Sequence, residues 1–393
     1  MGQNVSKAEK LKEIQIKNEV SVEGLNFNKH IFENLGVGDK YIEQVNTCFA
    51  SDRHFHSEIE FPSEFYSPKG GYLVPVKWNQ KSPYKLEVED GVYILKKGHQ
   101  IIWENLQFRK RPKYYGLKTS DGAQMRTVGP LLGYNNLQVT YSNECALKDK
   151  GEACLFCNIN ETKAAYGDAQ NITWKTPVQI AETFVAASKE GYDHITVSGG
   201  FVPERREVEY YLDVAEAILN LTGGTELNGS VTVGAPSDLS SIAKYKEAGY
   251  TGIATNLEVW HKSLFDYYCP GKSRQCGGRE NWIRALEEEV NVFGRYKVRS
   301  SFVSGLEHKE SMLEGFEILS EKGVICVPSS WFLNVGSPLE GHRTPEPEWH
   351  WEVQKRTAEI WRKNGIKWED IISCAGDSFV VQDIFRLEEG IEV

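Results

Sequence analysis

From residue 136 onward, short apolar runs alternate with longer stretches whose apolar residues recur at helical spacing. Apolar runs of this length, bounded by turn residues, predict β-strands, and the longer stretches predict amphipathic helices. We expect strands at 137–141, 194–197, 230–233, 252–255, 298–303, 324–327 and 371–374. We expect helices at 177–190, 207–221, 239–248, 280–293, 309–322 and 348–364.

The alternation of strands and helices indicates an α/β fold with a parallel sheet and right-handed crossovers. Residues 136–393 are long enough for a partial to nearly complete (β/α) TIM-like barrel, which takes about 250 residues when complete. A doubly wound open sheet is the alternative. Both folds bind ligands at the carboxyl ends of their strands, so residues at these ends are the first candidates for a functional site.

Residues 1–135 have a different pattern of apolar and polar residues. A polar stretch at 1–30 predicts either a polar helix or a frayed terminus, and residues 54–115 carry short aromatic and β-branched runs broken by turn residues. We therefore expect two domains, a smaller mixed α+β domain at 1–135 and the barrel domain at 136–393. The sequence assigns no role to the first domain, for which covering the end of the barrel and forming a homodimer are two options.

Composition narrows the class of protein. The chain has 393 residues, of which 40% are hydrophobic and 25% are charged, and this excludes a disordered, collagenous or disulfide-scaffold protein. The net charge of −10 disfavours binding to nucleic acid. No apolar run approaches the length of a membrane span or an export signal, so we expect a cytoplasmic protein with reduced cysteines. The first six residues fit the short N-myristoylation pattern, but a charged stretch follows them.

Three of the eight cysteines cluster directly after the first expected strand. Cys145, Cys154 and Cys157 have the spacing C-x8-C-x2-C. Three thiolates hold three irons of a four-iron cluster and leave the fourth iron open, whereas structural zinc takes four protein ligands. Attachment of c-type haem is excluded because Asn158 follows Cys157 where that motif requires histidine.

Two rival interpretations remain at this point. A structural zinc or iron-sulfur protein would need a fourth ligand, such as Cys48. An ordinary acid–base barrel enzyme would use Glu258 and His342, with the cysteines incidental.

The cysteine loop resembles that of the radical S-adenosylmethionine (radical SAM) superfamily. Its members usually carry C-x3-C-x2-C after the first barrel strand, with an aromatic residue before the last cysteine, and Phe156 occupies that place. The eight-residue gap between Cys145 and Cys154 is a variant spacing.

Further motifs follow in the order of that superfamily, nearest to its biotin synthase and hydrogenase-maturase branch. The second expected strand ends in Ser198-Gly199-Gly200, like the glycine motif that contacts the methionine part of SAM, although Phe201 stands in the usual acidic position and Glu204 is the nearest acid. The fourth strand is followed by Asn256 and Glu258, similar to an N-x-[DE] pair at the ribose. The fifth carries Val303 and Gly305, similar to the segment beside adenine.

The resemblance implies a chemistry as well as a fold. A [4Fe-4S] cluster on Cys145, Cys154 and Cys157 would reductively cleave SAM to methionine and a 5'-deoxyadenosyl radical, which abstracts hydrogen from a small-molecule substrate. An oxygen-sensitive cluster and an electron donor such as flavodoxin or ferredoxin follow from the same resemblance. The pattern does not select among sulfur insertion, rearrangement, cleavage and ring formation.

Substrate contacts are expected from the later strand ends and loops. The loop at 267–279 offers Arg274 and Arg279, and the stretch at 328–343 offers Trp331, His342 and Arg343. A second cluster on Cys269 and Cys276 would need Cys326 or Cys374 as well. Buried, unreactive thiols are the alternative for the last two.

Overall fold

The computed structural model describes residues 5–44, 60–142, 144–159, 174–332, 335–374 and 378–392. The chain divides into two compact units. The flanking unit comprises Met1–Pro112, Ser330–Ala358 and Ser378–Val393, and the barrel unit comprises Lys113–Ser329 and Glu359–Asp377. This division differs from the expected boundary at residue 135, because 113–135 lies with the barrel and two C-terminal segments lie with the N-terminal residues.

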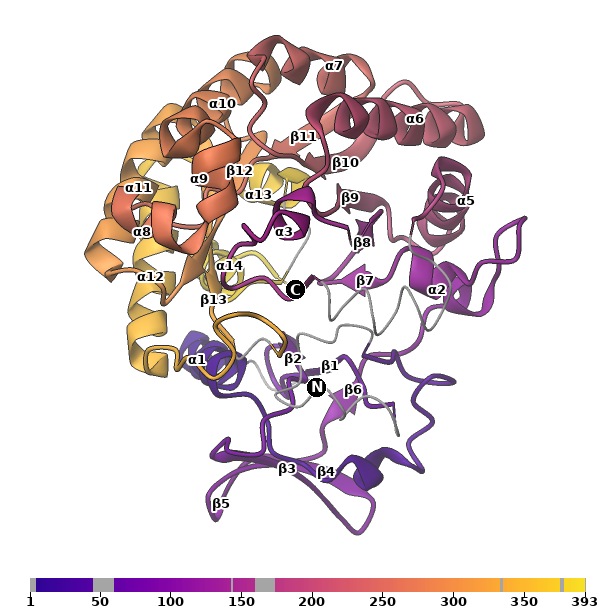
Figure 1. The fold of residues 1–393 in the computed structure, drawn as a ribbon. Helices are drawn as coiled ribbons and strands as arrows, with labels where there is room; N and C mark the ends of the chain where they lie inside the picture. Colours follow the sequence, from indigo (N-terminus) through magenta and orange to yellow (C-terminus); the bar gives the residue numbers. More distant parts are fainter. Residues whose placement is uncertain are drawn as a thin grey trace. The chain divides into compact units, whose positions relative to one another are not determined.

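A single curled sheet of seven strands forms the centre of the barrel unit (Figure 1). Its spatial order is β13-β12-β11-β10-β9-β8-β7. The strands are β7 (Leu131–Leu132), β8 (Asn136–Thr140), β9 (His194–Ser198), β10 (Leu227–Thr232), β11 (Tyr250–Ala254), β12 (Val298–Ser304) and β13 (Val324–Ser330). Neighbours from β8 to β12 pair in parallel, and β7 is antiparallel to β8. The prediction of a partial (β/α) barrel is confirmed.

Helices follow the strands and cover the outer side of the sheet, as Figure 1 shows for α5, α6, α7, α10 and α11. The longer ones are α5 (Pro177–Ser188), α6 (Glu204–Thr222), α10 (Gly278–Phe293), α11 (Lys309–Lys322) and α12 (Pro347–Lys363), of which α12 continues from the flanking unit into the barrel unit. The shorter ones are η4 (Lys113–Gly116), α2 (Met125–Val128), α3 (Ala146–Asp149), η6 (Leu239–Ser241), α7 (Ile242–Glu247), α8 (Lys262–Tyr268), α9 (Pro270–Gln275) and α13 (Trp368–Cys374).

One expected strand is wrong. Residues 371–374 belong to helix α13, in which Ile371 and Cys374 are buried and Ile372 is 37% exposed. Burial at positions i and i+3 is the period of a helix. A short apolar run does not distinguish a strand from a buried helical turn by its pattern alone, and here packing against the sheet decided.

The flanking unit is a mixed α+β structure built on two small antiparallel sheets. One sheet has the order β2-β1-β6, with β1 (Glu64–Tyr66), β2 (Leu73–Pro75) and β6 (Gln107–Phe108), and the other is β3 (Tyr84–Glu89), β4 (Val92–Lys97) and β5 (Gln100–Trp103). Its helices are α1 (Lys7–Glu23), η1 (Lys29–Phe32), α14 (Val380–Glu389) and the first part of α12. Aromatic side chains such as Phe32, Phe65 and Phe108 pack edge to face in its core.

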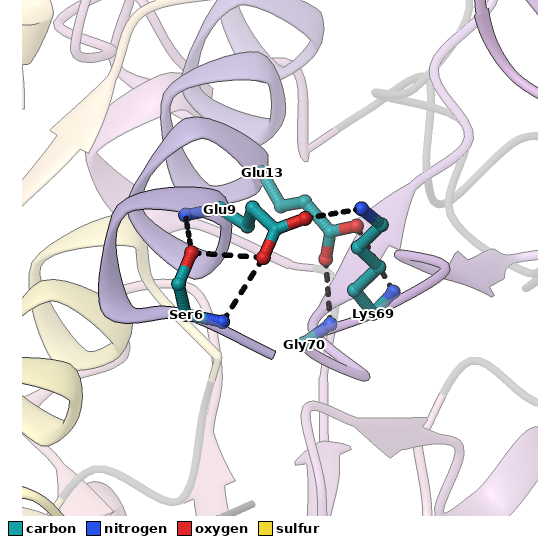
Figure 2. A network of polar contacts seen from close by, with 5 residues as sticks. All are labelled: Ser6, Glu9, Glu13, Lys69 and Gly70. Carbon is teal, nitrogen blue, oxygen red and sulfur yellow. Dashed lines mark hydrogen bonds and ion pairs between the residues drawn. The ribbon is translucent and has the colours of Figure 1, made fainter. Parts of the chain in front are cut away.

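The start of α1 is fastened to the loop between β1 and β2 by the contacts in Figure 2. Ser6 caps α1 in a reciprocal capping box with Glu9, which also pairs with Lys69 at 2.5 Å. The buried Glu13 carboxylate accepts hydrogen bonds from the backbone N–H groups of Lys69 and Gly70 at 2.9 and 2.6 Å. These contacts meet the rule that a buried charge needs hydrogen-bond partners, so we interpret them as structural.

Within the described residues, we find no helix that combines the length and the apolar character required of a membrane span.

Candidate functional site

The three clustered cysteines lie on the loop that leaves β8. Cys145 is the N-cap residue of α3, and a turn in which the Cys157 N–H donates to the Cys154 carbonyl at 3.0 Å joins the other two. All three are free and half-buried. The pKa of Cys157 is raised to about 12 by burial and then by the negative charge of Cys154 and, more weakly, Cys145. The loop thus carries all three thiols on one short stretch of chain after β8.

This donor set fits a four-iron cluster, which takes one thiolate on each of three irons when the fourth is left open. The described part of the chain contains no group of three or more His, Cys, Asp or Glu side chains arranged to hold a single metal ion. Cys48, the fourth ligand of the zinc interpretation, lies outside the described residues.

Two glycines at the end of β9 allow the cysteine loop to approach the sheet closely. A Cβ atom on Gly200 would lie 1.9 Å from the Glu144 carbonyl oxygen, and one on Gly199 would lie 2.5 Å from the Tyr141 ring. The Gly200 N–H donates to the Ser142 carbonyl at 3.1 Å. Any larger residue at 200 would therefore push the loop away.

The residues beside these glycines have partners of their own. Ser198 Oγ accepts a hydrogen bond from the side chain of Gln138 at 3.0 Å. The Glu204 carboxylate accepts hydrogen bonds from the N–H and Oγ of Ser237 at 2.9 and 2.7 Å. Glu204 therefore stabilises the loop after β10.

Asn256 and Glu258 follow β11 and are fixed against β12. Asn256 Oδ1 accepts from the Ser301 N–H at 3.1 Å, and the Glu258 N–H donates to the Ser301 carbonyl at 3.0 Å. Glu258 has a φ of +70°, a left-handed conformation that is unfavourable for residues other than glycine. Strained backbone of this kind is concentrated at functional sites.

A cation that is not among the expected site residues lies beside this pair. Lys272 Nζ donates to the Asn256 carbonyl at 2.8 Å and to Glu258 Oε1 at 3.0 Å, and it lies 4.2 Å from the centre of the Trp282 ring. Burial acts to lower the pKa of Lys272, but the charges of Glu258 and of the nearby thiols raise it overall. Its position between Cys269 and Cys276 in the sequence was the available signal.

The cysteine loop is bound to the α8–α9 segment through Glu152. The Glu152 carboxylate accepts from Arg274 Nε at 2.7 Å and from Gln275 Nε2 at 2.8 Å, and its carbonyl accepts from the Gly271 N–H at 3.1 Å. The Leu155 N–H donates to the Tyr268 carbonyl at 2.9 Å. Arg274, expected to bind substrate, therefore holds the cysteine loop in this structure.

Arg279 and the end of β12 lie farther along the sheet edge. The Arg279 guanidinium stacks 4.1 Å from the centre of the Trp260 ring, and its Nε donates to the Trp260 carbonyl. Val303 N–H donates to the Glu258 carbonyl at 2.9 Å, and Gly305 follows β12 with a φ of +111°. These contacts join the expected ribose and adenine segments.

The other expected substrate residues belong to the flanking unit. Trp331 Nε1 donates to the His342 carbonyl at 3.0 Å, and Arg343 pairs with Glu346 at 2.5 Å. Their role in substrate binding stays a prediction.

The remaining cysteines of the described residues are buried. Cys326 lies in β13, and the Cys374 thiol donates to the carbonyls of Tyr296 and Asp370 at 3.4 Å each. Cys269 is different, because the backbone bond between Leu155 and Tyr268 sets it opposite Cys154 of the cysteine loop.

Comparisons with known proteins bear on the resemblance. The chain matches no protein-family model. It is 28% identical over 267 residues to the bacteriochlorophyllide c C-7(1)-hydroxylase of Chlorobaculum limnaeum. The aligned region covers 64% of this chain and 65% of the hydroxylase, so this chain spans slightly less than two thirds of that relative's length. This similarity is consistent with the resemblance predicted from the motifs.

Two solved structures have a similar chain path. HydG, a maturase of the [FeFe]-hydrogenase, has a TM-score of 0.47 at 15% identity over 66% of this chain and 57% of its own. Methylornithine synthase (PylB) has a TM-score of 0.44 at 16% identity over 71% and 79%.

Proposed function

We propose that this chain is a radical SAM enzyme in which Cys145, Cys154 and Cys157 hold a [4Fe-4S] cluster. When bound, this group would supply the electron that cleaves SAM to methionine and a 5'-deoxyadenosyl radical, the species that abstracts hydrogen from a small-molecule substrate. The chain's own residues would bind SAM, orient it and keep water away from the radical.

SAM would lie along the strand ends, with its methionine part at Ser198, Gly199 and Gly200. The ribose hydroxyls would reach Asn256 and Glu258, since a carboxylate at a strand end is well placed to accept from vicinal hydroxyls. Adenine would lie beside Val303 and Gly305, which the backbone bond from Val303 to Glu258 keeps next to the ribose site.

Lys272 has a positioning role in this proposal. It holds one oxygen of Glu258, and no other hydrogen-bond partner of that carboxylate is found among the described residues. Glu258 Oε2 is therefore the oxygen with which the ribose would be bound. A partly buried charge also needs a counter-ion, which Lys272 provides.

The observation that carries the proposal is the meeting of the cysteine loop with Glu258 at one edge of the sheet. The cysteine loop is hydrogen-bonded to the α8–α9 segment through Leu155 and Glu152, and Lys272 of that segment pairs with Glu258 at 3.0 Å. A nucleotide that bridges a cluster and a ribose-binding carboxylate fits this arrangement.

The substrate is open within this chemistry. The hydroxylase relative acts, by its name, on bacteriochlorophyllide c at C-7(1). For this chain we propose only that a C–H bond of a small molecule is attacked, with Arg279, Trp331, His342 and Arg343 as candidate contacts. Flavodoxin or ferredoxin as the electron donor, and a homodimer, belong to the same proposal.

Anaerobic reconstitution of the full chain with iron and sulfide tests the proposed radical SAM function. We expect about four irons per chain, with release of methionine and 5'-deoxyadenosine on addition of dithionite and SAM, while Cys157→Ser abolishes this turnover. Cys326→Ala, a buried cysteine of β13, is the matched control and should keep its iron and its turnover. One zinc per chain, or full turnover by Cys157→Ser, would contradict the proposal.

A further inference from the structure

A fourth thiol lies against the cysteine loop. Cys269, the residue between α8 and α9, is fully buried and lies opposite Cys154, because the adjoining residues Leu155 and Tyr268 are hydrogen-bonded through their backbones. The spacing of the three clustered cysteines gives no sign of this contact, because Cys269 is 112 residues further along the chain than Cys157.

Backbone bonds on both sides of the pair hold the two thiols together. The Leu155 N–H, next to Cys154, donates to the carbonyl of Tyr268, next to Cys269, at 2.9 Å. The Gly271 N–H donates to the Glu152 carbonyl at 3.1 Å, and a Cβ on Gly271 would lie 2.5 Å from that oxygen. The contact is therefore part of the way the loop is docked and does not depend on one side-chain rotamer.

Cys145, Cys154 and Cys157 already supply the three thiolates that a four-iron cluster with an open iron takes, so Cys269 is not needed as a ligand. Its place opposite Cys154, between two backbone hydrogen bonds, is instead the arrangement from which a disulfide forms with little backbone movement. The two thiols also differ in access, since Cys154 is half-buried and Cys269 is fully buried.

We propose that Cys154 and Cys269 form an intrachain disulfide when the cluster is absent, and that this bond closes the cluster site to iron until it is reduced. Only the second part rests on the proposed function. Oxidised glutathione is the oxidant: the half-buried Cys154 sulfur attacks its disulfide, which releases one glutathione thiol and leaves a mixed disulfide on Cys154. Cys269 then attacks the Cys154 sulfur and releases the second glutathione thiol.

The atoms and electrons balance in this exchange. The two protein thiols lose two protons and two electrons and gain one S–S bond, while oxidised glutathione loses its S–S bond and takes up both electrons and both protons. A dithiol reductant reverses the reaction and restores Cys154 as a ligand.

The test uses the cluster-free full chain, reduced and then incubated anaerobically with oxidised glutathione. We expect two of the eight thiols to be lost, and peptide mass spectrometry after alkylation to recover a Cys154–Cys269 crosslink. In Cys269→Ser the crosslink is absent and glutathione stays attached to Cys154. Cys276→Ser, a buried cysteine of the same segment, is the matched control and should crosslink like the unmodified sequence.

Iron uptake separates this inference from the proposed function. The crosslinked chain should bind iron and sulfide only after dithiothreitol is added. A Cys154–Cys157 crosslink, mixed pairings or eight free thiols in the unmodified sequence overturn the inference even when the reduced chain builds its cluster. If the crosslink forms but the reduced chain binds no iron, the proposed function fails and the thiol pair stands.

Discussion

At the scale of single residues, Glu258 shows how the end of a strand can hold a carboxylate in a fixed position. Its backbone takes up a left-handed conformation, its amide and carbonyl are bound to β12, and Lys272 holds one carboxylate oxygen. The conformation costs free energy that the bonds to β12 offset. A side chain held this firmly loses little conformational entropy when a ligand binds.

Glu258→Gln should weaken SAM binding, because an amide accepts from ribose hydroxyls less strongly than a carboxylate does. Complete loss of a hydrogen bond to a charged group costs about 1.5–3 kcal/mol, a rise of roughly 10- to 150-fold in the dissociation constant, and the amide, which keeps a weaker bond, should give a rise of about 10-fold. Equilibrium dialysis of SAM against the anaerobically reconstituted protein measures this change.

Glu280→Gln is the control for this substitution. Glu280 is exposed on the same stretch of chain and pairs with Lys262 at 3.4 Å, so its loss should leave SAM binding unchanged. Iron content is checked in both variants. Equal dissociation constants for both variants and the unmodified sequence would place the ribose site elsewhere.

At the scale of elements, α1 and α14 show how segments from the two ends of the chain build one unit. Lys17 on α1 pairs with Asp383 on α14 at 2.5 Å and donates to the Ser378 carbonyl at 2.8 Å. Both charged side chains are at most 1% exposed. A buried ion pair adds little net stability, because burial removes both charges from water. Each charge nevertheless needs the other, since an unpaired buried charge is strongly destabilising.

Lys17→Met should destabilise the flanking unit strongly, because it removes a charged partner from the fully buried Asp383 carboxylate. Breaking a buried ion pair at one partner typically costs about 3–5 kcal/mol of unfolding free energy. Urea unfolding followed by tryptophan fluorescence measures the loss.

Lys69→Met is the matched substitution on an exposed pair. Lys69 and its partner Glu9 are about half exposed, so solvent screens their attraction and no resolvable loss is expected. An equal effect of the two substitutions would show that burial of the Lys17 pair is not what matters.

At the scale of the whole molecule, a buried carboxyl group in the barrel unit makes the free energy of unfolding depend on pH. Glu289 on α10 is fully buried, accepts a hydrogen bond from Thr255 through Oε1, and its Oε2 has no partner in the part of the chain described. Burial raises its pKa from 4.5 to about 8, against the smaller effect of the Thr255 hydrogen bond. The folded protein therefore keeps a proton that the unfolded chain releases.

The sign of the effect follows from proton binding. Between about pH 4.5 and 8 the folded state binds more protons than the unfolded state, so the contribution of Glu289 to stability is complete below that window and is lost as pH rises through it. Glu289→Gln should remove this dependence. Between pH 6 and 8 the unmodified protein should lose on the order of 1–2 kcal/mol more than the variant does.

Urea unfolding at pH 6 and pH 8 measures that difference, with Glu288→Gln as the control. The neighbouring Glu288 lies on the exposed side of α10 and bonds to Asn291 at 3.0 Å. Parallel pH profiles for the unmodified protein and Glu289→Gln would mean that Glu289 is ionised in the folded state.

The sequence by itself determined the parts of this protein that depend on neighbours along the chain. Short apolar runs between helical patterns placed six of the seven expected strands in the sheet. The order of the cysteine loop, Gly199-Gly200 and the Asn256–Glu258 pair pointed to the strand ends that carry the candidate site. These features are local, since each is fixed by a few consecutive residues and by where a strand ends.

Tertiary structure decided what depends on contacts between distant residues. It turned 371–374 into a helix, joined 330–358 and 378–393 to the N-terminal residues, and brought Lys272 to Glu258 and Cys269 to the cysteine loop. No local pattern encodes these outcomes, because burial and charge pairing depend on which surfaces meet after the chain has folded.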